Sequence, residues 1–254
     1  AWYEIHLRRY PFLYSEITGY ALSAFVFLKR ISGRGEWLER AADAADWLIR
    51  NACHADGGIK TRYYLVKHYV SPNYCFHHGR VYSFDTAIVG YGFLQLYRET
   101  KQAKYLDAAE SNIAFLMDPM RKKTGAFTPY LDSGKKQCQE DRSKWSDQGG
   151  SFHAKLALLF IDYCRITGNR VYEKAARALL DHTLSLQEGD GRFITAQSDR
   201  STHLHPHAYT LEGLLYGAVH LNEARYLNAC LRGFRWMLKG VSSDGSVSSI
   251  YSGS

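Results

Sequence analysis

The sequence predicts an all-α protein built from tandem helical hairpins. Apolar residues make up 46% of the 254 residues, which is enough to bury a core and excludes a disordered chain. These apolar residues recur at helical spacing, and one pattern returns four times along the chain. A glycine turn follows each copy of the pattern. Because the repeat runs from end to end, we expect a single domain over residues 1–254.

Four segments of this repeat align without gaps. Each begins with an aromatic residue and has a small residue four positions later, and the aromatic residues are Trp37, Tyr105, Tyr172 and Tyr226. Each segment ends in a turn whose second residue is glycine, at Gly57, Gly125, Gly191 and Gly245. Residues four apart lie on one face of a helix. Each segment therefore predicts one amphipathic helix and the turn that ends it.

A second, more apolar helix precedes each amphipathic helix. Its expected starts are Thr18, Thr86, His153 and His207. Residues 21–28 and 154–161 are apolar on most sides, which is typical of a buried helix. Buried and exposed helices that alternate through short links predict an α/α toroid, with parallel inner helices. Closed toroids contain more than four hairpins, so we expect an open arc or a piece of a longer protein. A closed bundle of four hairpins is the alternative.

Parallel inner helices would gather their N-termini at one mouth. Helix N-termini carry unpaired N–H groups and partial positive charge, which favour anionic or hydroxyl-rich ligands. The residues expected at this mouth are Glu16, Thr18, Asp85, Thr86, Ser151, His153, His205 and His207. Helix capping alone would explain Thr18, Asp85 and Ser151, so both interpretations stay open for these three.

The long loop over residues 58–83 would open onto the same mouth. Tyrosine rings stack on the C–H faces of sugars, while Arg and His side chains bind carboxylate or hydroxyl groups. The substrate-binding residues expected from this loop are Arg62, Tyr63, Tyr74, His77, His78 and Arg80. The second long loop, 125–148, is more polar and is a candidate mobile lid.

The densest group of reactive side chains lies between residues 202 and 213. His203, His205 and His207 alternate ahead of Tyr209 and Glu212, and these groups suit acid/base chemistry. We expect an extended segment up to Pro206, because proline disfavours helix in the residue before it. Glu212 would be a buried carboxylate on an inner helix, which is costly unless it is paired or used. A structural Glu212 that bonds a neighbouring hairpin is the alternative. His153, His203, His205 and Tyr209 join the expected substrate-binding residues.

Charge and motifs exclude several classes of protein. The net charge of +7 favours anionic partners such as an acidic polysaccharide, but the Lys and Arg residues are scattered, so we expect no nucleic acid. No apolar run is long enough to span a membrane. The first residues lack a signal-peptide core, which slightly favours the cytoplasm. P-loop, GxGxxG and zinc signatures are absent, so we expect no cofactor and no metal.

The inner-helix motifs resemble those of the six-hairpin toroid superfamily. They are Ser-Glu-Ile-Thr-Gly-Tyr at 15–20, Phe-Asp-Thr at 84–86, Thr-His at 202–203 and Tyr-Thr-Leu-Glu-Gly-Leu-Leu at 209–215. Ser15 and Ala87 depart from the Pro and Gly of the family pattern. The superfamily includes glycoside hydrolases, unsaturated glucuronyl hydrolases, polysaccharide lyases and N-acylglucosamine 2-epimerase. The chain looks most like the toroid proteins associated with bacterial exopolysaccharide biosynthesis. This resemblance implies action on carbohydrate without selecting a reaction.

We expect a glycoside hydrolase-like enzyme, with Asp85, Glu212, His207 and Glu16 as catalytic residues. Hydrolysis needs one protonated and one ionised carboxyl group, and Asp85 with Glu212 or Glu16 is the candidate set. A lyase acting on a uronic acid would use His or Tyr as base and Arg on the carboxylate. A 2-epimerase would use His78 with His207. A non-catalytic glycan-binding module of polysaccharide assembly is the rival class, and the oligomeric state is left open.

Overall fold

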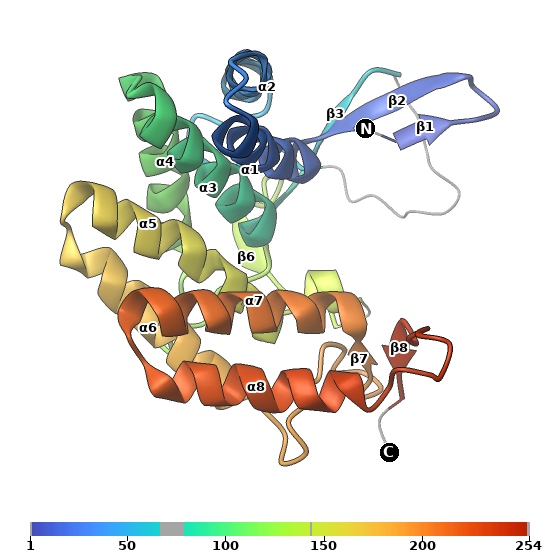
Figure 1. The fold of residues 1–254 in the computed structure, drawn as a ribbon. Coiled ribbons are helices and arrows are strands. Elements are labelled where there is room, and N and C mark those ends of the chain that lie inside the picture. Colours follow the sequence, from blue (N-terminus) through green and yellow to red (C-terminus); the bar gives the residue numbers. More distant parts are fainter. Residues whose placement is uncertain (1, 67–78, 143, 253–254) are drawn as a thin grey trace. The chain divides into compact units, whose positions relative to one another are not determined.

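The computed structural model describes residues 2–66, 79–142 and 144–252. These residues form eight α-helices joined by short strands and turns, which confirms the prediction of an all-α protein of helical hairpins (Figure 1). The chain divides into two compact units. The first is Ala1–Met120 with Tyr130–Cys138, and the second is Arg121–Pro129 with Gln139–Ser254. The single domain expected from the repeat stays a prediction.

The first unit contains two hairpins, which are α1 (Ser15–Ser32) with α2 (Glu36–Asn51) and α3 (Ser83–Thr100) with α4 (Ala103–Phe115). The inner helices α1 and α3 pack along each other. Gly19 lies against Val89, and Gly92 lies against Leu22, three residues further along each helix. Equal steps on both helices mean that α1 and α3 run in the same direction.

The second unit repeats this arrangement. The 3₁₀-helix η3 (Ser151–Leu156) leads into α5 (Ala157–Thr167), and the remaining helices are α6 (Arg170–Leu184), α7 (Leu204–Leu221) and α8 (Ala224–Leu238). The Thr210 hydroxyl donates a hydrogen bond of 3.0 Å to Ser151 Oγ. Three residues further along, Gly213 lies against Ala154. The inner helices of this unit are therefore parallel as well, as the sequence predicted.

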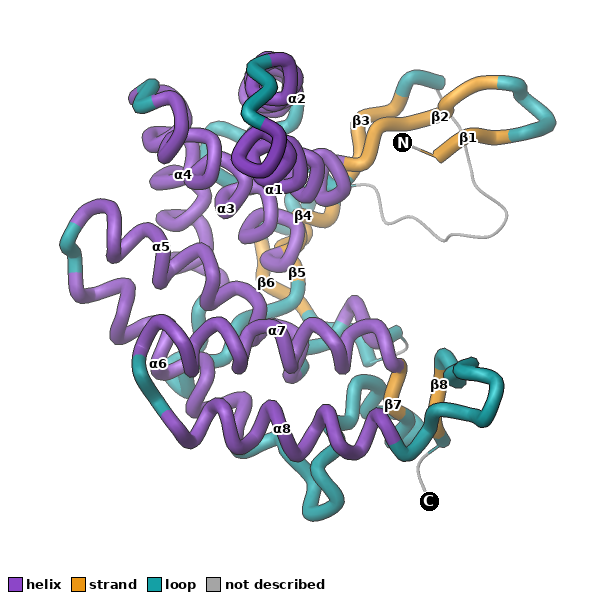
Figure 2. The backbone as a smooth tube through the Cα atoms, viewed as in Figure 1, coloured by secondary structure: helices purple, strands orange, loops and turns teal. Residues whose placement is uncertain are grey.

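Short strands lead into three inner helices, and the sequence predicted an extended approach only for the last of them (Figure 2). They are β2 (Arg9–Tyr14), β4 (Arg80–Tyr82) and β7 (Thr202–His203), and their antiparallel partners are β3 (Arg62–Tyr64), β5 (Tyr130–Asp132) and β8 (Ile250–Tyr251). Two further strands, β1 (Trp2–Glu4) and β6 (Gln137–Gln139), lie at sheet edges. The last residue of each leading strand pairs with the residue five positions after the turn glycine of the same hairpin, in the pairs Tyr14 with Arg62, Tyr82 with Tyr130 and His203 with Ile250.

These strands correct the expected helix starts. The inner helices begin two or three residues early, at Ser15, Ser83, Ser151 and Leu204. Capping by Thr18, Asp85 and Ser151 is wrong, because the N-cap positions belong to Tyr14, Tyr82 and Gly150. The strand partner supplies an acceptor instead, since the Ser15 N–H donates to the Thr61 carbonyl at 3.0 Å. The Thr18 hydroxyl donates back to the Tyr14 carbonyl.

Burial of the inner helices is confirmed for α3 and α5 but only for one side of α1. Residues 157–164 of α5 are all buried. On α1, Leu22 and Val26 are buried against its neighbours, while Phe27 and Ile31 are 59% and 65% exposed. The reason is that α1 packs mainly on α2 and α3, which together cover one side of it.

The four glycine turns share one structure. Each glycine has a φ between 82° and 102°, a left-handed conformation that favours glycine. The side chain of the residue before the glycine accepts a hydrogen bond from the N–H of the residue directly after the glycine. In the first turn, Asp56 accepts this bond from Gly58 at 3.0 Å. A Cβ added at Gly57, Gly125 or Gly191 would lie within 2.7 Å of the carbonyl oxygen of Ser111, Ala178 or Arg232 on the next outer helix. Around Gly245 no described atom lies within 4 Å of such a Cβ.

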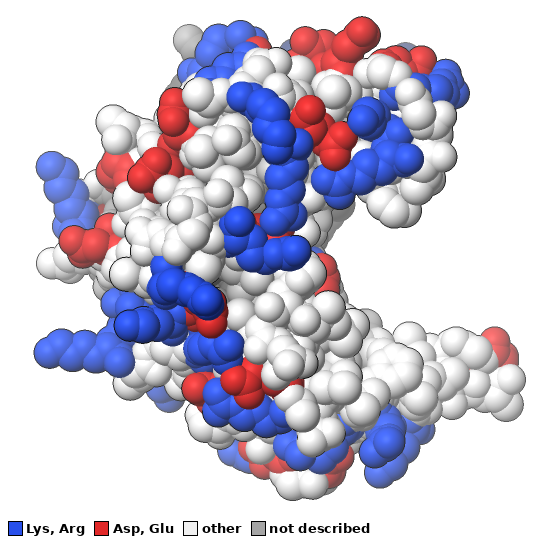
Figure 3. All heavy atoms as spheres, turned by 60° about the vertical axis from the view of Figure 1, so that its left-hand side comes forward, with Lys and Arg blue, Asp and Glu red and all other residues white. Residues whose placement is uncertain are grey.

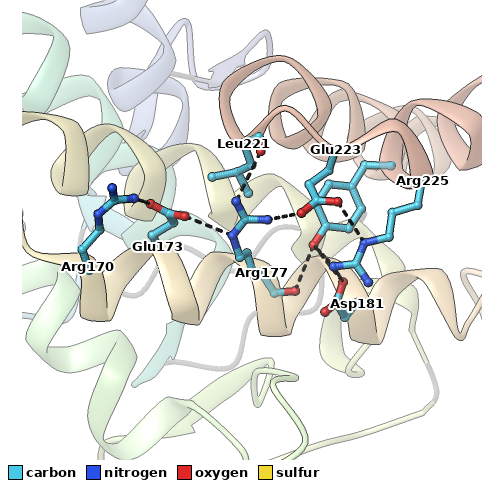
Figure 4. A network of polar contacts seen from close by, with 8 residues as sticks. Arg170, Glu173, Arg177, Asp181, Leu221, Glu223 and Arg225 are labelled. Atoms are coloured by element: carbon cyan, nitrogen blue, oxygen red, sulfur yellow. Dashed lines mark hydrogen bonds and ion pairs between the residues drawn. The ribbon is translucent and has the colours of Figure 1, made fainter.

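Ion pairs join the outer helices of the second unit (Figure 4). Arg177 of α6 contacts both Glu173 and Glu223, and Arg225 of α8 lies 2.9 Å from Asp181 of α6. These side chains are between 20% and 49% exposed, so each pair contributes about 0–1 kcal/mol. The network therefore adds only a small part of the stability of this unit.

Charged side chains are spread over the surface. On the face drawn in Figure 3, Lys and Arg are interspersed with Asp and Glu, and uncharged residues separate them. This mixture is the scattered pattern that the sequence predicted. Within the described part of the chain, no helix is both long and apolar enough to cross a bilayer.

The turn glycines allow a matched test. Gly191→Ala would suffer both the left-handed conformation, about 1–2 kcal/mol, and a clash with the Arg232 carbonyl, about 1–3 kcal/mol. Gly245→Ala would suffer only the first cost. We expect chemical denaturation to show a larger loss of unfolding free energy for Gly191→Ala. Equal losses would mean that the turn gains nothing from its contact with the next helix.

Candidate active site

Two carboxyl groups lie close together in the first unit. Glu16 is in the first turn of α1 and Asp85 is in the first turn of α3, so parallel packing brings them together. Both are buried, with 8% and 5% exposed. Burial, followed by the charge of Glu16, raises the pKa of Asp85 to about 8, although Thr61 and Arg62 lower it. Asp85 therefore carries a proton at neutral pH beside a second carboxyl group.

Tyr14 and Arg62 complete what we call the carboxyl cluster, which is Tyr14, Glu16, Arg62 and Asp85. Tyr14 faces Arg62 across the β2–β3 ladder, so strand register places Arg62 beside the helix start. The Tyr14 hydroxyl bonds Glu16, and burial together with the charges of Asp85 and Glu16 raises the pKa of Tyr14 far above its ordinary value. The Arg62 guanidinium lies 4.6 Å from the Phe12 ring and 5.0 Å from the Tyr14 ring. The cluster thus combines acid, carboxylate, hydroxyl and guanidinium groups.

One carboxyl oxygen of Asp85 is buried without a hydrogen-bond partner in the described part of the chain. This oxygen is Oδ2. Buried polar atoms without a partner are rare in folded proteins. This atom can therefore hold a proton or meet a hydroxyl group without first breaking a bond within the described chain.

In the second unit, a line of aromatic and charged side chains follows α7. His205, Tyr209 and Glu212 are about one turn apart on this helix. The His205 ring lies 4.5 Å from Tyr209 and 5.8 Å from Trp145. Lys155 Nζ lies 4.3 Å from the centre of the Tyr209 ring and 2.7 Å from Glu212 Oε2. We call these five residues the α7 cluster, and they offer stacking surfaces beside an ion pair.

The burial expected for Glu212 is wrong. Its side chain is 50% exposed, whereas the paired Lys155 is only 5% exposed. The reason is that Gly213, and not Glu212, packs against Ala154 of η3, and Glu212 lies about 100° further around α7 at the edge of this contact. A buried ammonium group needs a partner to offset its lost hydration, and Glu212 provides one.

His207 points away from the α7 cluster into the core. It is 0% exposed, and its ring packs between Phe193 and Trp236. Its Nδ1 accepts a hydrogen bond from the Phe193 N–H at 3.4 Å, and its Nε2 donates to the Gly233 carbonyl at 3.2 Å. Burial lowers the pKa of His207. Both ring nitrogens are thus occupied by the backbone, which assigns this residue a structural task.

The ring of His153 and the backbone of His203 also take part in hydrogen bonds. His153 is 1% exposed, its Nδ1 accepts a bond from the Gly150 N–H, and burial lowers its pKa to about 3, so it is neutral at physiological pH. His203 is the N-cap residue of α7, and its N–H donates to Thr195 Oγ1 at 2.7 Å. The extended segment expected up to Pro206 ends earlier, because a proline is tolerated in the first turn of a helix.

The other expected binding residues are dispersed. The Tyr63 ring meets Trp47 edge to face at 5.3 Å, and the Arg80 guanidinium lies 4.0 Å from the Tyr130 ring. The positions Tyr74, His77 and His78 lie outside the described residues. In the part of the chain that is described, no three His, Cys, Asp or Glu side chains form a group that could hold a metal ion.

Three members of these clusters were missed from the sequence. Lys155 had a visible signal, since it is the only charged residue in the apolar run 154–161. Tyr14 and Trp145 had none, because their roles depend on a strand register and on a 3₁₀-helix, η2 (Trp145–Asp147). The structure brings together Glu16, Arg62 and Asp85 in one unit, and His205, Tyr209 and Glu212 in the other.

Comparison with known proteins identifies the fold. No family model and no curated protein matches the sequence. Among solved structures, a GH76 α-mannanase from Bacteroides thetaiotaomicron is similar with a TM-score of 0.74 and 12% identity, over 96% of this chain and 66% of that one. A cellobiose 2-epimerase from Bacillus thermoamylovorans gives 0.75 and 12%, over 94% and 66%. A D-mannose isomerase gives 0.72 and 11%, over 96% and 65%.

The chain thus has the α/α toroid fold that these glycosidase and epimerase structures share, which confirms the expectation from the sequence. It spans about two thirds of the length of the structures that it matches, 66% for the first of them.

Asp85 should make stability depend on pH. Its folded pKa of about 8 lies above its ordinary value of 3.8, so the contribution of the protonated group is complete below pH 4 and is lost as pH rises to about 8. Asp85→Asn cannot lose a proton. We expect the unfolding free energy of the natural protein to fall relative to this variant between pH 4 and 8, by at most about 1.4 kcal/mol per pH unit. A constant difference across urea titrations at pH 5, 7 and 9 would contradict the raised pKa.

The assignment of His207 can be tested in the same way. His207→Phe keeps the ring volume but leaves the Phe193 N–H and the Gly233 carbonyl unpaired, at a cost of about 1–3 kcal/mol for each. We expect a clear fall in thermal unfolding temperature. A variant of unchanged stability that lacks activity would instead identify His207 as catalytic.

Proposed function

We propose that this protein is a carbohydrate-active enzyme that hydrolyses a glycosidic bond at the carboxyl cluster. The observation that carries the proposal is the buried pair Glu16 and Asp85, in which Asp85 is protonated at neutral pH. Glycosidases use a pair of carboxyl groups in these two states. The α/α toroid fold, shared with mannanase and epimerase structures, supports a sugar substrate.

Each member of the cluster has a task in this reaction. Asp85 donates its proton to the glycosidic oxygen as the bond to the anomeric carbon breaks. Glu16 acts as the carboxylate, either on the attacking water or directly on the anomeric carbon. Arg62 and Tyr14 would bind sugar hydroxyl groups or the carboxylate of an acidic sugar, which the net charge of +7 also favours.

A second candidate is a sugar epimerase or isomerase, which the similarity to cellobiose 2-epimerase and D-mannose isomerase structures favours. Proton transfer at a sugar carbon would then use His205 and Tyr209, whose rings lie 4.5 Å apart. Burial and the charge of Lys155 lower the pKa of His205, which leaves it neutral and able to accept a proton. Elimination by a polysaccharide lyase and binding without turnover are the remaining alternatives.

The activity test uses acidic and neutral oligosaccharides with analysis for new reducing ends, epimers and unsaturated uronates. We expect new reducing ends, and a kcat/KM that falls as pH rises through about 8, because Asp85 then loses its proton. Asp85→Asn and Glu16→Gln should each lower kcat by about 10²-fold or more. Glu99→Gln is the matched control, since Glu99 lies in the last turn of α3 and pairs with Lys29 and Arg30.

Other outcomes would select a different function. Epimers without new reducing ends, lost in His205→Ala but kept in Asp85→Asn, would support the epimerase. Unsaturated products would indicate a lyase. Binding of sugars without any product, in a folded protein, would leave a glycan-binding module.

A further inference from the structure

A stripe of apolar side chains runs along α8. Leu227, Leu231, Phe234 and Leu238 follow one another at intervals of four, three and four residues and are 39–50% exposed. Beyond the helix, Val241, Val247 and Ile250 are 41–48% exposed. A contiguous apolar surface of this kind on a folded protein marks an interaction site. We call the four helical residues the α8 stripe.

The repeat shows what normally covers this surface. Phe234 lies eight residues after the repeat aromatic Tyr226, and the residues at this position in α2, α4 and α6 are Ala45, Ile113 and Leu180. All three are 0% exposed, whereas Phe234 is 43% exposed. In the second unit, Leu180 packs against Gly217 of α7, the inner helix that follows α6. Phe234 is thus the residue on which a following inner helix would pack.

The inner helix of the same hairpin has a similar exposed side. Leu215 and Val219 of α7 are 47% and 67% exposed. The residues 54 positions earlier, the spacing that relates Tyr226 to Tyr172, are Ile161, which is 2% exposed, and Arg165. At the position of Leu215, an apolar residue that is buried in the preceding copy of the repeat is therefore exposed in the last, and Val219 extends this exposed apolar side.

The glycine turn is the third sign of a missing neighbour. Three of the four turn glycines meet a carbonyl of the next outer helix, and Gly245 meets no described atom. Its φ of 82° and the hydrogen bond from the Ser246 N–H to Asp244 Oδ1 nevertheless reproduce the same turn. The turn therefore keeps its conformation without the helix on which the other turns rest.

Charge indicates the chemistry of the missing neighbour. In each unit, a base in the first turn of the second outer helix pairs with an aspartate of the outer helix before it, as Lys104 with Asp46 at 2.7 Å and Arg225 with Asp181 at 2.9 Å. Both aspartates lie nine residues after the repeat aromatic. In α8 this position is Arg235. A helix that follows α8 would therefore carry an acidic residue in its first turn.

We propose that the exposed face formed by Leu215, Val219, the α8 stripe, Arg235 and Gly245 is the seat of a further helical hairpin of the same repeat. Its inner helix covers the apolar residues, its outer helix rests on Gly245, and a carboxylate in the first turn of that outer helix pairs with Arg235. The similar solved structures are longer than the part that this chain matches, which is 66% of the first of them. Their remaining length is enough for at least one further hairpin.

A second copy of this chain fits the same face less well. Two α8 stripes that pack around a two-fold axis would place Arg235, which flanks the stripe, at the interface in both copies. Like charges that are brought together across an interface are destabilising. The face therefore favours an acidic partner helix over itself.

The test appends a model hairpin to the full chain. A copy of residues 147–193 is fused after Ser254, which separates Gly245 from the copied His153 as Gly191 is separated from His207. The copy carries Val171→Glu, which places the carboxylate directly before its repeat aromatic. We expect hydrogen exchange of the α8 amides to slow by at least about tenfold relative to the original chain.

Two controls block the seat without altering the copy. Gly245→Val and Phe234→Asp, each in the fused chain, should restore the fast exchange of α8. Exchange in the fused chain as fast as in the original chain would overturn the proposal, whether or not the copy is helical, because the face is proposed to bind it. Light scattering that shows a dimer of the original chain, dissociated by Phe234→Asp, would also overturn it and identify a second copy as the occupant.

Discussion

Close approach of backbones at glycine is the constraint on which this structure depends. Gly19 and Gly213 let neighbouring inner helices meet, and Gly57, Gly125 and Gly191 let each turn rest on the next outer helix. A side chain at any of these positions would push helices apart. Packing between hairpins, rather than any ion pair, therefore sets the direction and spacing of the helices.

This spacing is what creates the carboxyl cluster. Because α1 and α3 run in the same direction at close range, Glu16 and Asp85 in their first turns are held near each other and away from water. The strands ahead of the helices add Tyr14 and Arg62 in fixed register. Neither strand nor helix alone would bring the four side chains together.

The repeat made the helical hairpins predictable from the sequence, but it did not determine the helix starts or the orientation of single side chains. Aromatic, small and glycine positions predicted the hairpins, their parallel inner helices and the meeting of Glu16 with Asp85. The helix starts were wrong because a strand partner, and not a side chain, satisfies the first N–H of α1. His205 and His207 look alike in the sequence, yet one faces Tyr209 and the other is buried against Gly233. Such differences depend on small rotations along a helix, which apolar periodicity does not determine.

The pairing of each strand end with the chain beyond its turn has an evolutionary consequence. Arg62 and Tyr130 are each followed by twenty residues before the next inner helix, whereas the third hairpin needs only seven between Ala196 and Leu204. Arg62 and Tyr130 are anchored by their pairing with Tyr14 and Tyr82, whereas Ala196 pairs with Ser201. Segments between these anchors can therefore lengthen, shorten or be exchanged while the helices keep their places, so new specificities can arise one loop at a time on an unchanged scaffold.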